Sequence, residues 1–598
     1  MKRNAILSLS AILATQLMGA DDLNEMIKEG KFGGYVRIHH IEPAFSDTVA
    51  ATGSVIGGKL KYQTGALYGL RFGAAMYTTH DTGLTKWDYK TRDGYSQVAQ
   101  GLHGDDMNDY TTLGEAYASY RFSNTDIAYG RQEFQTPMTQ NAVTIIPNLF
   151  EGTVAKIKEL PDFTLTAAHI TKMQFGTRAA TDAALIGDGT YAITSGAGFG
   201  FVSPVVATNG TITPGMGKES FQDMGEATFG RTGTGGLSGP ARMDTSGVTS
   251  LGIEYKKGNL EARVWDYYAH EMYNTVYADA EYKINAGPAK VSLGAQILTQ
   301  SDLSDFTTSA GGNFLKTERE VTHPNRTKLY KTKLSEDGQI DATVYGLQAK
   351  AGIGDWNFNV AYTDSNDGHV INAWGGDPLY TSTIFTRNNY RADTSAYKVG
   401  GEYDFGSLGI KGLKFSINHA EYDSNVKTTA TSLNGTTYIA GAGSHTEKSS
   451  ETDYMLFYAV PSVKGLWFRL FHVQRDNDTR NSDQAHTRLI ANLSFYGADR
   501  RLSRRDMLKA SGIGAAALAL GGVSAAPAAA AERSSAASSL AVMKTSGMRS
   551  CVARRRNSNS RRPSCRGCAP WRAATRCRRT ISTRPSAAPR PPMQRWPK

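Results

Sequence analysis

Charged residues recur at every second position in segments of about ten residues, which predicts chemistry spread along a surface rather than gathered at one centre. In Val276–Ile284, apolar side chains alternate with Tyr277, Asp279, Glu281 and Lys283. Successive side chains of a strand point to opposite faces, so each segment presents one apolar and one charged face. A row of cations opposite carboxylates would create a transverse field that orients anionic or zwitterionic solutes.

The charged face is predicted to hold the side chains that are out of phase with the apolar residues of their own segments. The basic members are Arg37, Lys59, Lys61, Arg71, Arg121, Arg263, Lys283, Arg469 and Arg488. The acidic members are Glu115, Glu254, Glu261, Asp279 and Glu281. Arg131 joins them only if a bulge separates it from Tyr129, which has the same phase. The alternative is that each charge only solvates its face and pairs with a neighbour.

Histidines give little support to catalysis or metal binding. Those near the ends of predicted strands, or adjacent in the first one, are His39, His40, His80, His169 and His270. A hydrolase needs a nucleophile beside a histidine base, and no flanking pattern such as G-x-S-x-G accompanies these residues. The histidines are dispersed and Met1–Phe495 has no cysteine, so no metal and no cofactor is predicted. An outer-membrane hydrolase remains a remote alternative.

The N-terminus predicts export. Residues 1–20 combine basic Lys2 and Arg3, an apolar run over Ala5–Met18 and small residues before Asp21. This order is typical of a signal peptide, here cleaved after Ala20. The alternative is a membrane-anchored helix, but the apolar run is shorter than the ~20 residues that a membrane span needs.

The elements that must position the charges are predicted to be eighteen β-strands. Their expected ranges are 31–41, 53–64, 66–80, 111–122, 124–133, 145–158, 162–173, 247–256, 259–269, 274–285, 288–300, 340–353, 355–364, 394–405, 412–423, 451–460, 464–476 and 486–495. Tight turns alternate with long connections, including 80–110, 174–246, 301–339, 365–393 and 424–450. This alternation predicts an all-β, transmembrane antiparallel barrel, because a soluble sandwich has no reason to sort its connections. Aromatic residues near strand ends, including Tyr77, Trp265 and Tyr267, fit the interfacial girdles of such a barrel.

Four segments carry a resemblance to a known family. They are Gly57–Thr79, Arg131–Pro137, Ile145–Ile170 and Trp265–Ile284, and they resemble the OprD-type outer-membrane porin family, particularly its branch in the Campylobacterota. The resemblance covers residues 20–495 and implies a porin barrel over 21–495. It implies passive diffusion of small charged or zwitterionic solutes, such as amino acids, peptides, carboxylates and ions. A surface or adhesion barrel without significant transport is the alternative.

The resemblance also implies an inward loop after the fifth strand. An eighteen-stranded barrel is too wide for side chains to fill, so a loop must narrow its lumen. The residues expected there are Gln135, Thr136, Pro137, Met138, Thr139, Gln140 and Asn141. Pro137 discourages further strand pairing. Relatives often place charges in this loop, whereas this segment is uncharged, which argues against tight ionic selectivity at the loop itself.

The expected partners follow from the porin interpretation. They are outer-membrane lipid and lipopolysaccharide, the barrel assembly machinery that recognises a terminal aromatic such as Phe495, and small solutes, with the barrel a monomer or a trimer. The localisation is the cell outer membrane. Nucleic acid is not an expected partner, although the residues after Phe495 are rich in arginine.

Charge and cysteine content divide the chain at Phe495. The residues after it carry 22 of the 66 basic residues, 3 of the 55 acidic ones and all four cysteines. Within 496–532, Ser503–Lys509 resembles a twin-arginine export signal. Residues 533–598 are a basic mixture of Arg, Ser, Pro and Ala, which predicts disorder. We expect this extension to be a fusion or assembly artefact.

Overall fold

The computed structural model describes residues 20–45, 52–85, 101–140, 143–177, 205–206, 212–213, 217–229, 245–307, 312–313, 315–316, 319–322, 328–332, 335, 337–372, 374–384, 388–434, 437–477 and 484–497. The expected signal peptide, apart from Ala20, lies outside the described residues, as do Asn141 and residues 498–598. Within the described residues, no helix is both long and apolar enough to cross a bilayer.

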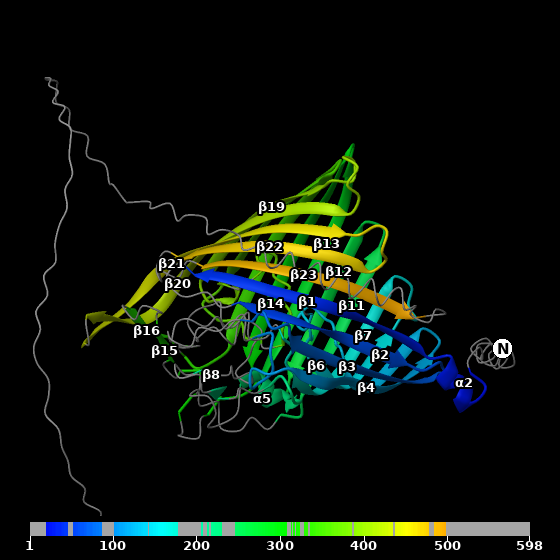
Figure 1. Cartoon of the computed structure of the whole chain (residues 1–598). Coiled ribbons are helices and arrows are strands. Elements are labelled where there is room, and N and C mark those ends of the chain that lie inside the picture. The colour runs from blue at the N-terminus through cyan, green and yellow to red at the C-terminus, as the bar shows by residue number, and fades with distance from the viewer. Residues whose placement is uncertain are drawn as a thin grey trace, which may run out of the picture. The chain divides into compact units, whose positions relative to one another are not determined.

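Eighteen antiparallel strands form a closed wall within the described residues (Figure 1). They are β1 (Lys31–Phe45), β2 (Gly53–Gln63), β3 (Leu70–Asp81), β4 (Tyr110–Phe122), β5 (Thr125–Gln132), β6 (Leu149–Ile157), β7 (Phe163–Gln174), β11 (Val248–Lys257), β12 (Leu260–Ala269), β13 (Tyr273–Ala286), β14 (Ala289–Asp302), β17 (Asp341–Ile353), β18 (Trp356–Ser365), β19 (Thr394–Asp404), β20 (Leu413–Asn434), β21 (Thr437–Ala459), β22 (Leu466–Asn477) and β23 (Gln484–Gly497). β1 pairs with both β2 and β23, which closes the sheet. The predicted barrel is confirmed.

The connections sort to two ends of the barrel. Tight turns and the short helix α2 (Leu23–Lys28) lie at one end, and the described parts of the long connections lie at the other (Figure 1). We call these the turn end and the loop end. Gly287 and Gly354 occupy two-residue turns with φ of 62° and 59°, a conformation that glycine adopts without steric cost.

Several predicted boundaries were wrong. β3 begins at Leu70 because Tyr68 and Gly69 form a turn with φ of 49° and 87°. β6 begins at Leu149, and β23 continues to Gly497. The predicted loop over 424–450 is instead the extended hairpin of β20 and β21, which remain paired out to Asn434 and Thr437. A strand outside a bilayer has water on both faces, so it needs no alternating apolar pattern.

The loop end carries short additional elements within the described residues. They are β8 (Val205–Val206), β9 (Ile212–Thr213), β10 (Gln222–Asp223), α5 (Met224–Phe229), β15 (Arg319–Thr322), β16 (Lys328–Thr332) and the 3-10 helix η2 (Asn388–Tyr390). β15 pairs with β16, and β16 pairs with β20 next to the extended hairpin.

The outer face of the wall is apolar, as β3 illustrates. Phe72 and Met76 expose 47% and 54% of their surface, whereas Ala75 and Tyr77 are buried on the inward phase. Large apolar side chains are exposed in the same way on most wall strands, including Leu60, Leu251, Val264, Leu293, Leu347, Val360, Ile417 and Leu470. Such a band suits lipid chains.

Part of the interior is a packed aromatic core rather than open lumen. Trp265 and Tyr267 on β12 stack with ring centroids 5.8 Å apart, and Tyr273 on β13 stacks on Trp374 at 5.7 Å. All four are fully buried, as is Tyr77 on β3. Tyr77, Trp265 and Tyr267 therefore point inward, and their assignment to an interfacial girdle was wrong. Alternation alone places them on the inward phase. Tyr77 is paired with Lys59 in the β2–β3 ladder, and Trp265 and Tyr267 follow Arg263 at alternate positions of β12.

Candidate functional site

A cavity of about 900 Å³ opens at the turn end, and we call it the lower vestibule. Its charged lining residues are Glu29, Lys31, Lys59, Lys61, Arg71, Glu115, Arg121, Asp126 and Glu133. Lys59 and Lys61 alternate along β2, so both point inward from one strand. The bulge that β4 forms opposite Ala75 and Met76 brings Glu115 into the same phase.

Charges in the lower vestibule are interleaved as ion pairs. Lys59 Nζ lies 2.5 Å from Glu115 Oε1 and 2.6 Å from Glu133 Oε1. Lys61 Nζ lies 2.5 Å from Glu115 Oε2. The Tyr77 hydroxyl donates to both carboxylates at 2.7 Å. Nearer the mouth, a second group joins Arg71 and Arg121 to Asp126.

A second cavity of about 710 Å³ lies deeper in the barrel, and we call it the upper chamber. Its charged lining residues are Arg263, Asp279, Glu281, Lys350, Asp377, Lys398, Asp453, Arg469 and Arg488. On the wall formed by β12, β13 and β17, the charges are paired. Arg263 binds Asp279 through two bonds of 2.8 and 2.7 Å, and Lys350 Nζ lies 2.9 Å from Glu281.

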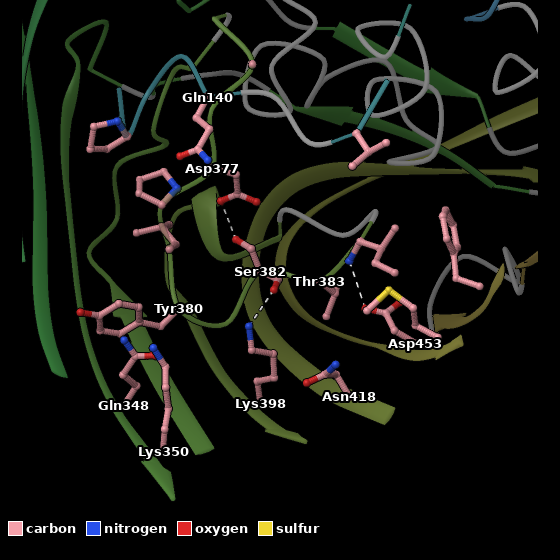
Figure 2. A pocket seen from close by; sticks show the side chains of 18 of the residues that line it. Gln140, Gln348, Lys350, Asp377, Tyr380, Ser382, Thr383, Lys398, Asn418 and Asp453 are labelled. Atoms are coloured by element: carbon pink, nitrogen blue, oxygen red, sulfur yellow. Dashed lines mark hydrogen bonds between the residues drawn. The ribbon is translucent and has the colours of Figure 1, made fainter. Parts of the chain in front are cut away.

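Elsewhere in the upper chamber, charged side chains bind neutral groups (Figure 2). Lys398 Nζ donates to the Ser382 carbonyl at 2.9 Å. Asp377 accepts a bond from the Ser382 hydroxyl at 2.6 Å. Asp453 accepts the backbone N–H of Ile384 at 3.1 Å. Each of these contacts joins a charged group to a neutral donor or acceptor of the β18–β19 connection.

Two arginines on the β22 and β23 wall rest on aromatic rings. The guanidinium of Arg469 lies 5.5 Å from the Trp467 ring centroid and 5.8 Å from that of Phe457. The guanidinium of Arg488 lies 5.3 Å from the Phe471 ring centroid. A ring face holds a guanidinium by cation–π attraction without adding a counter-charge. Arg469 and Arg488 both line the chamber, so this wall brings two basic side chains to it.

Among the described residues, two loops line the upper chamber, where one was predicted. Pro137 and Gln140 of the predicted loop line the upper chamber, together with residues 375, 377–380 and 382–384 of the β18–β19 connection. The loops meet where the Gly376 N–H donates to the Met138 carbonyl at 3.0 Å. The β18–β19 segment was not predicted to turn inward. The sequence GGDP at 375–378 indicates a turn, but it does not indicate whether the loop folds into the barrel or away from it.

The base of the predicted loop is held by β1. The Tyr35 hydroxyl donates to the Ile145 carbonyl at 2.8 Å, and Arg37 donates to the Thr144 carbonyl and to Asn492 Oδ1. A niche of about 190 Å³ lies here, lined by Gln135 and Thr139 among others. Thr136, Met138 and Thr139 are buried. Pro137 is buried as well, so four of the six described residues of the predicted loop are packed into the protein.

Most predicted inward charges are brought to these cavities. Lys59, Lys61, Arg71, Glu115 and Arg121 line the lower vestibule. Arg263, Asp279, Glu281, Arg469 and Arg488 line the upper chamber, and Arg37 lines the niche. Glu254, opposite Arg263 in the β11–β12 ladder, and Lys283, 2.5 Å from Glu261, lie outside these three cavities.

Arg131 differs from the prediction. The β5 register runs without a shift against both neighbours, so no bulge separates Arg131 from Tyr129, which is 69% exposed. Arg131 Nε instead lies 2.8 Å from Glu151 Oε2, and the guanidinium lies 4.5 Å from the Phe221 ring centroid. It lines none of the three cavities described above.

A buried latch joins two loops at the loop end. Lys218 Nζ donates to the carbonyls of Gly101 and His103 at 3.2 and 2.7 Å, and the backbone N–H of Lys218 donates to Asp105. Burial lowers the pKa of Lys218 to about 8 and that of His103 to about 4, and burial raises the pKa of Asp105. The latch lies near the place where Thr112 of β4 donates to Gln174 of β7, at 3.2 Å.

Comparison with known proteins agrees with this architecture. The family model described as outer membrane porin, OprD family, matches residues 67–197 and 223–496. No curated protein matches the chain. Among solved structures, OccK1 (OpdK) of Pseudomonas aeruginosa is similar with 16% identity and a TM-score of 0.53, covering 79% of this chain and 100% of that one. OccK8 (OprE) of the same species is similar with 16% identity and a TM-score of 0.55, and the match covers 79% of this chain and 100% of that one. The structure of OpdK of P. aeruginosa with vanillate is similar with 17% identity and a TM-score of 0.54, and the match covers 79% of this chain and 100% of that one. The family match spans more than half of the sequence, and the chain therefore belongs to the OprD family of outer membrane porins.

Proposed function

We propose that this porin passes small carboxylate-bearing solutes, anionic or zwitterionic, by passive diffusion. The observation that carries the proposal is the upper chamber, which Arg469 and Arg488 line from β22 and β23, while the Arg263–Asp279 and Lys350–Glu281 pairs line the wall formed by β12, β13 and β17. A solute carboxylate can be drawn toward the arginine wall, and a solute ammonium toward a carboxylate such as Asp377.

Cavity size is consistent with small solutes. Volumes of about 710 and 900 Å³ fall within the range of ~300–1,000 Å³ that is typical of small-molecule sites. One similar structure is that of OpdK with vanillate, an aromatic carboxylate. That ligand belongs to OpdK, and it supports carboxylates as the first class to test for this chain.

The test is permeation through liposomes that contain the full chain. Gluconate and sorbitol form a matched pair, because they are similar in size and differ mainly by a carboxylate. We expect both to enter, and gluconate to enter faster per unit concentration gradient. Liposomes that stay impermeable to both solutes contradict transport altogether, and equal rates contradict the carboxylate preference.

Surface adhesion is a second candidate, and one observation favours it. β20 and β21 are 22 and 23 residues long, whereas a membrane-spanning strand needs ~9–11 residues. The excess, with β16 paired to β20, extends the sheet beyond the wall at the loop end (Figure 1). Binding of labelled cells by the full chain, with no solute entry in the liposome test, would favour adhesion.

We expect no hydrolase activity. His419 Nδ1 lies 2.8 Å from the Thr452 hydroxyl and its Nε2 lies 3.4 Å from Glu421, an order that resembles a nucleophile, base and acid. Hydrolysis also needs N–H donors aimed at an oxyanion, and Thr452 lies within ladders with both neighbouring strands. An esterase and phospholipase assay on the purified chain checks this expectation.

The finer assignments rest on the sequence. The four resembling segments support a place in the Campylobacterota branch of the family. The assembly machinery is expected to read the end of β23, and the barrel to be a monomer or a trimer. We infer a signal peptide at 1–20 and a twin-arginine-like segment at 496–532, followed by an artefactual tail at 533–598. Mass spectrometry of native outer membranes tests the join: tail peptides linked to Phe495 would contradict the artefact.

A further inference from the structure

Two glutamines of β14 contact the backbone of the β18–β19 connection inside the barrel. Gln296 and Gln300 lie on the inward phase of β14, on either side of the buried Leu298. Both glutamines are buried, with 5% and 2% of their surface exposed. Burial of an amide is costly unless its donor and acceptor are both bonded, so the partners of these two side chains indicate their role.

Gln300 binds one residue of the connection through both ends of its amide. The Ile371 N–H donates to Gln300 Oε1 at 2.7 Å, and Gln300 Nε2 donates to the Ile371 carbonyl at 2.9 Å. The same nitrogen also donates to the Thr275 hydroxyl on β13 at 2.8 Å, which fixes the amide against the wall. Two opposed bonds to one residue reproduce the hydrogen-bonded pair of an antiparallel ladder. Gln300 therefore takes the place of a neighbouring strand.

Gln296 binds the connection in a similar way, one turn of the chain later. In the amide orientation that satisfies both neighbours, Gln296 donates to the Pro378 carbonyl at 3.1 Å and accepts the Tyr380 N–H at 3.1 Å. The Tyr380 hydroxyl also donates to the Ala295 carbonyl of β14 at 3.2 Å. The connection is thus attached to β14 at both ends of residues 371–380.

Glycines on the same wall leave room for these contacts. The β14–β17 ladder pairs Gln296 with Gly346 and Gln348 with Gly294. An added Cβ at Gly346 would lie 3.0 Å from the Gln296 side chain, and one at Gly294 would lie 3.1 Å from the Tyr380 hydroxyl. A glycine inside a strand often allows another part of the chain to approach closely. The wall is therefore shaped to receive the connection.

Two asparagines bind the stretch between these points. Asn372 accepts the Trp374 N–H at 3.1 Å and donates to the Gly376 carbonyl. Asn148 donates to the Trp374 carbonyl at 3.0 Å and accepts the Gly176 N–H at 2.7 Å. Each amide supplies a donor and an acceptor and carries no charge. Neutral amides thus bind the backbone of this stretch at several points.

Ionisable side chains hold the next part of the connection. Lys398 donates to the Ser382 carbonyl at 2.9 Å, and Asp453 accepts the Ile384 N–H at 3.1 Å (Figure 2). The stretch held by amides is the one that bonds the loop over 135–140, through Gly376. The contact between the two loops therefore depends on the amide-held stretch.

We propose that Gln296 and Gln300 are positioning residues of the pore, which hold residues 371–380 inward and thereby set the opening beside the loop over 135–140. The upper chamber changes shape when this stretch moves, because residues 375 and 377–380 line it. The proposal rests on passage through the barrel but not on a preference for carboxylates.

The test replaces each glutamine with glutamate in the full chain and records single channels in planar bilayers at about pH 4 and about pH 8. A protonated carboxyl donates and accepts, as the amide does, whereas a carboxylate only accepts and leaves the Ile371 or Pro378 carbonyl without its donor. In alkali, we expect Gln300→Glu and Gln296→Glu to occupy a second conductance level roughly tenfold more often than the native chain. In acid, the occupancy should return to the native value.

Two further variants separate the hydrogen bonds from the added charge. Gln300→Leu has neither donor nor acceptor, so it should show the second level in acid and in alkali alike. Asn418→Asp is the matched control, because it makes the same change from amide to acid in the same chamber. Asn418 accepts a bond from Asn359 at 3.2 Å, which a carboxylate keeps. This control should alter ion selectivity without producing the second level.

A single level in both glutamate variants in alkali overturns the proposal. A second level that persists in acid, or that also occurs in Asn418→Asp, overturns it as well. If one glutamate variant does not insert into the bilayer, the other provides the same test.

Hydrogen exchange at the Ile371 amide gives a readout that does not depend on transport. Exchange should be faster in Gln300→Leu than in the native chain, and unchanged exchange overturns the proposal. Faster exchange in this variant, together with a native chain that does not conduct, would contradict passage through the barrel and support the hold on the connection.

Discussion

The lower vestibule and the upper chamber contain the same charges in different arrangements. Among the described residues, five basic and four acidic side chains line each cavity. In the lower vestibule they interleave, with Lys59 and Lys61 both on Glu115. In the upper chamber, Arg469 and Arg488 lie on aromatic rings, and Asp453 accepts a backbone N–H.

This difference teaches that charge composition and electrostatic field are separate properties of a pore wall. Opposite charges a few ångströms apart cancel at the distance of a passing solute, and salt screens what remains over ~10 Å at 0.1 M. In the upper chamber, Arg469 and Arg488 bring two basic side chains to one wall, where their contacts include aromatic rings. We therefore expect solute selection in the upper chamber, with the lower vestibule serving as a hydrated opening at the turn end.

The largest expected effect comes from separating the two loops that bound the upper chamber. An added Cβ at Gly376 would overlap the backbone of Pro137 and Met138, so Gly376→Ala should destabilise the loop contact by about 3 kcal/mol, the upper part of the range for overpacking. Single-channel recordings should show higher conductance with fluctuations. The control is Gly401→Ala on β19, where the new Cβ would meet no atom closer than 3.6 Å. Equal effects at both sites would break the comparison.

The next effect is acid loosening of the latch at the loop end. The folded pKa of His103 is about 4, below its unfolded value of ~6.5, so the latch is fully stable above pH 6.5 and loses stability as pH falls toward 4. By pH 5 the loss is about 2 kcal/mol, before the opposite contribution of Asp105, whose pKa is raised by burial.

Hydrogen exchange at residues 101–105 measures this loosening. Exchange, corrected for its intrinsic pH dependence, should accelerate between pH 7 and 5 in the native chain and stay constant in His103→Gln. The turn at 64–66 beside the lower vestibule should not respond. Protection of 101–105 that is independent of pH would contradict the role of His103.

A smaller effect is expected from removing charge in the upper chamber. Arg469→Gln/Arg488→Gln should lower the ratio of anion to cation permeability by roughly tenfold, a free-energy change of about 1.4 kcal/mol. Reversal potentials across a KCl gradient measure the ratio. The shift should shrink in 1 M salt, where the Debye length is ~3 Å. A ratio that does not change would show that these arginines are not exposed to permeating ions.

The smallest effect is expected from the same charge removal in the lower vestibule. After Lys61→Gln, Glu115 keeps Lys59, and after Arg121→Gln, Asp126 keeps Arg71. The permeability ratio should therefore change by less than about twofold, as for exposed ion pairs elsewhere. A shift as large as that of the arginine pair would place selection in the lower vestibule instead.

Much of the fold was predictable because one physical rule repeats along the chain. Lipid on one face and water on the other impose a period of two, so Val276–Ile284 alone indicates which side chains face inward. The same rule fails where its cause is absent. Beyond the bilayer, β20 and β21 continue with no such pattern, and the predicted loop at 424–450 was wrong.

The site was predictable only in part. The alternation of side chains along each strand predicted which charges point inward, including Lys59 and Arg263. It could not predict which of these charges form ion pairs, because that depends on the register between strands that are distant in sequence. The alternation also predicts that Arg131 points to the same face as Tyr129 unless a bulge intervenes, and the unshifted β4–β5 ladder contains no such bulge. The inward β18–β19 loop was missed because its direction depends on long-range contacts such as Gly376 with Met138.

The central claim, that arrangement rather than composition of charge selects solutes, is tested most directly by three proteins in one liposome assay. These are the native chain, Arg469→Gln/Arg488→Gln and Lys61→Gln/Arg121→Gln, and both variants lose two positive charges. The measured quantity is the ratio of gluconate to sorbitol entry. We predict that the ratio falls only in the variant of the upper chamber. Equal falls in both variants, or no fall in either, would contradict the claim.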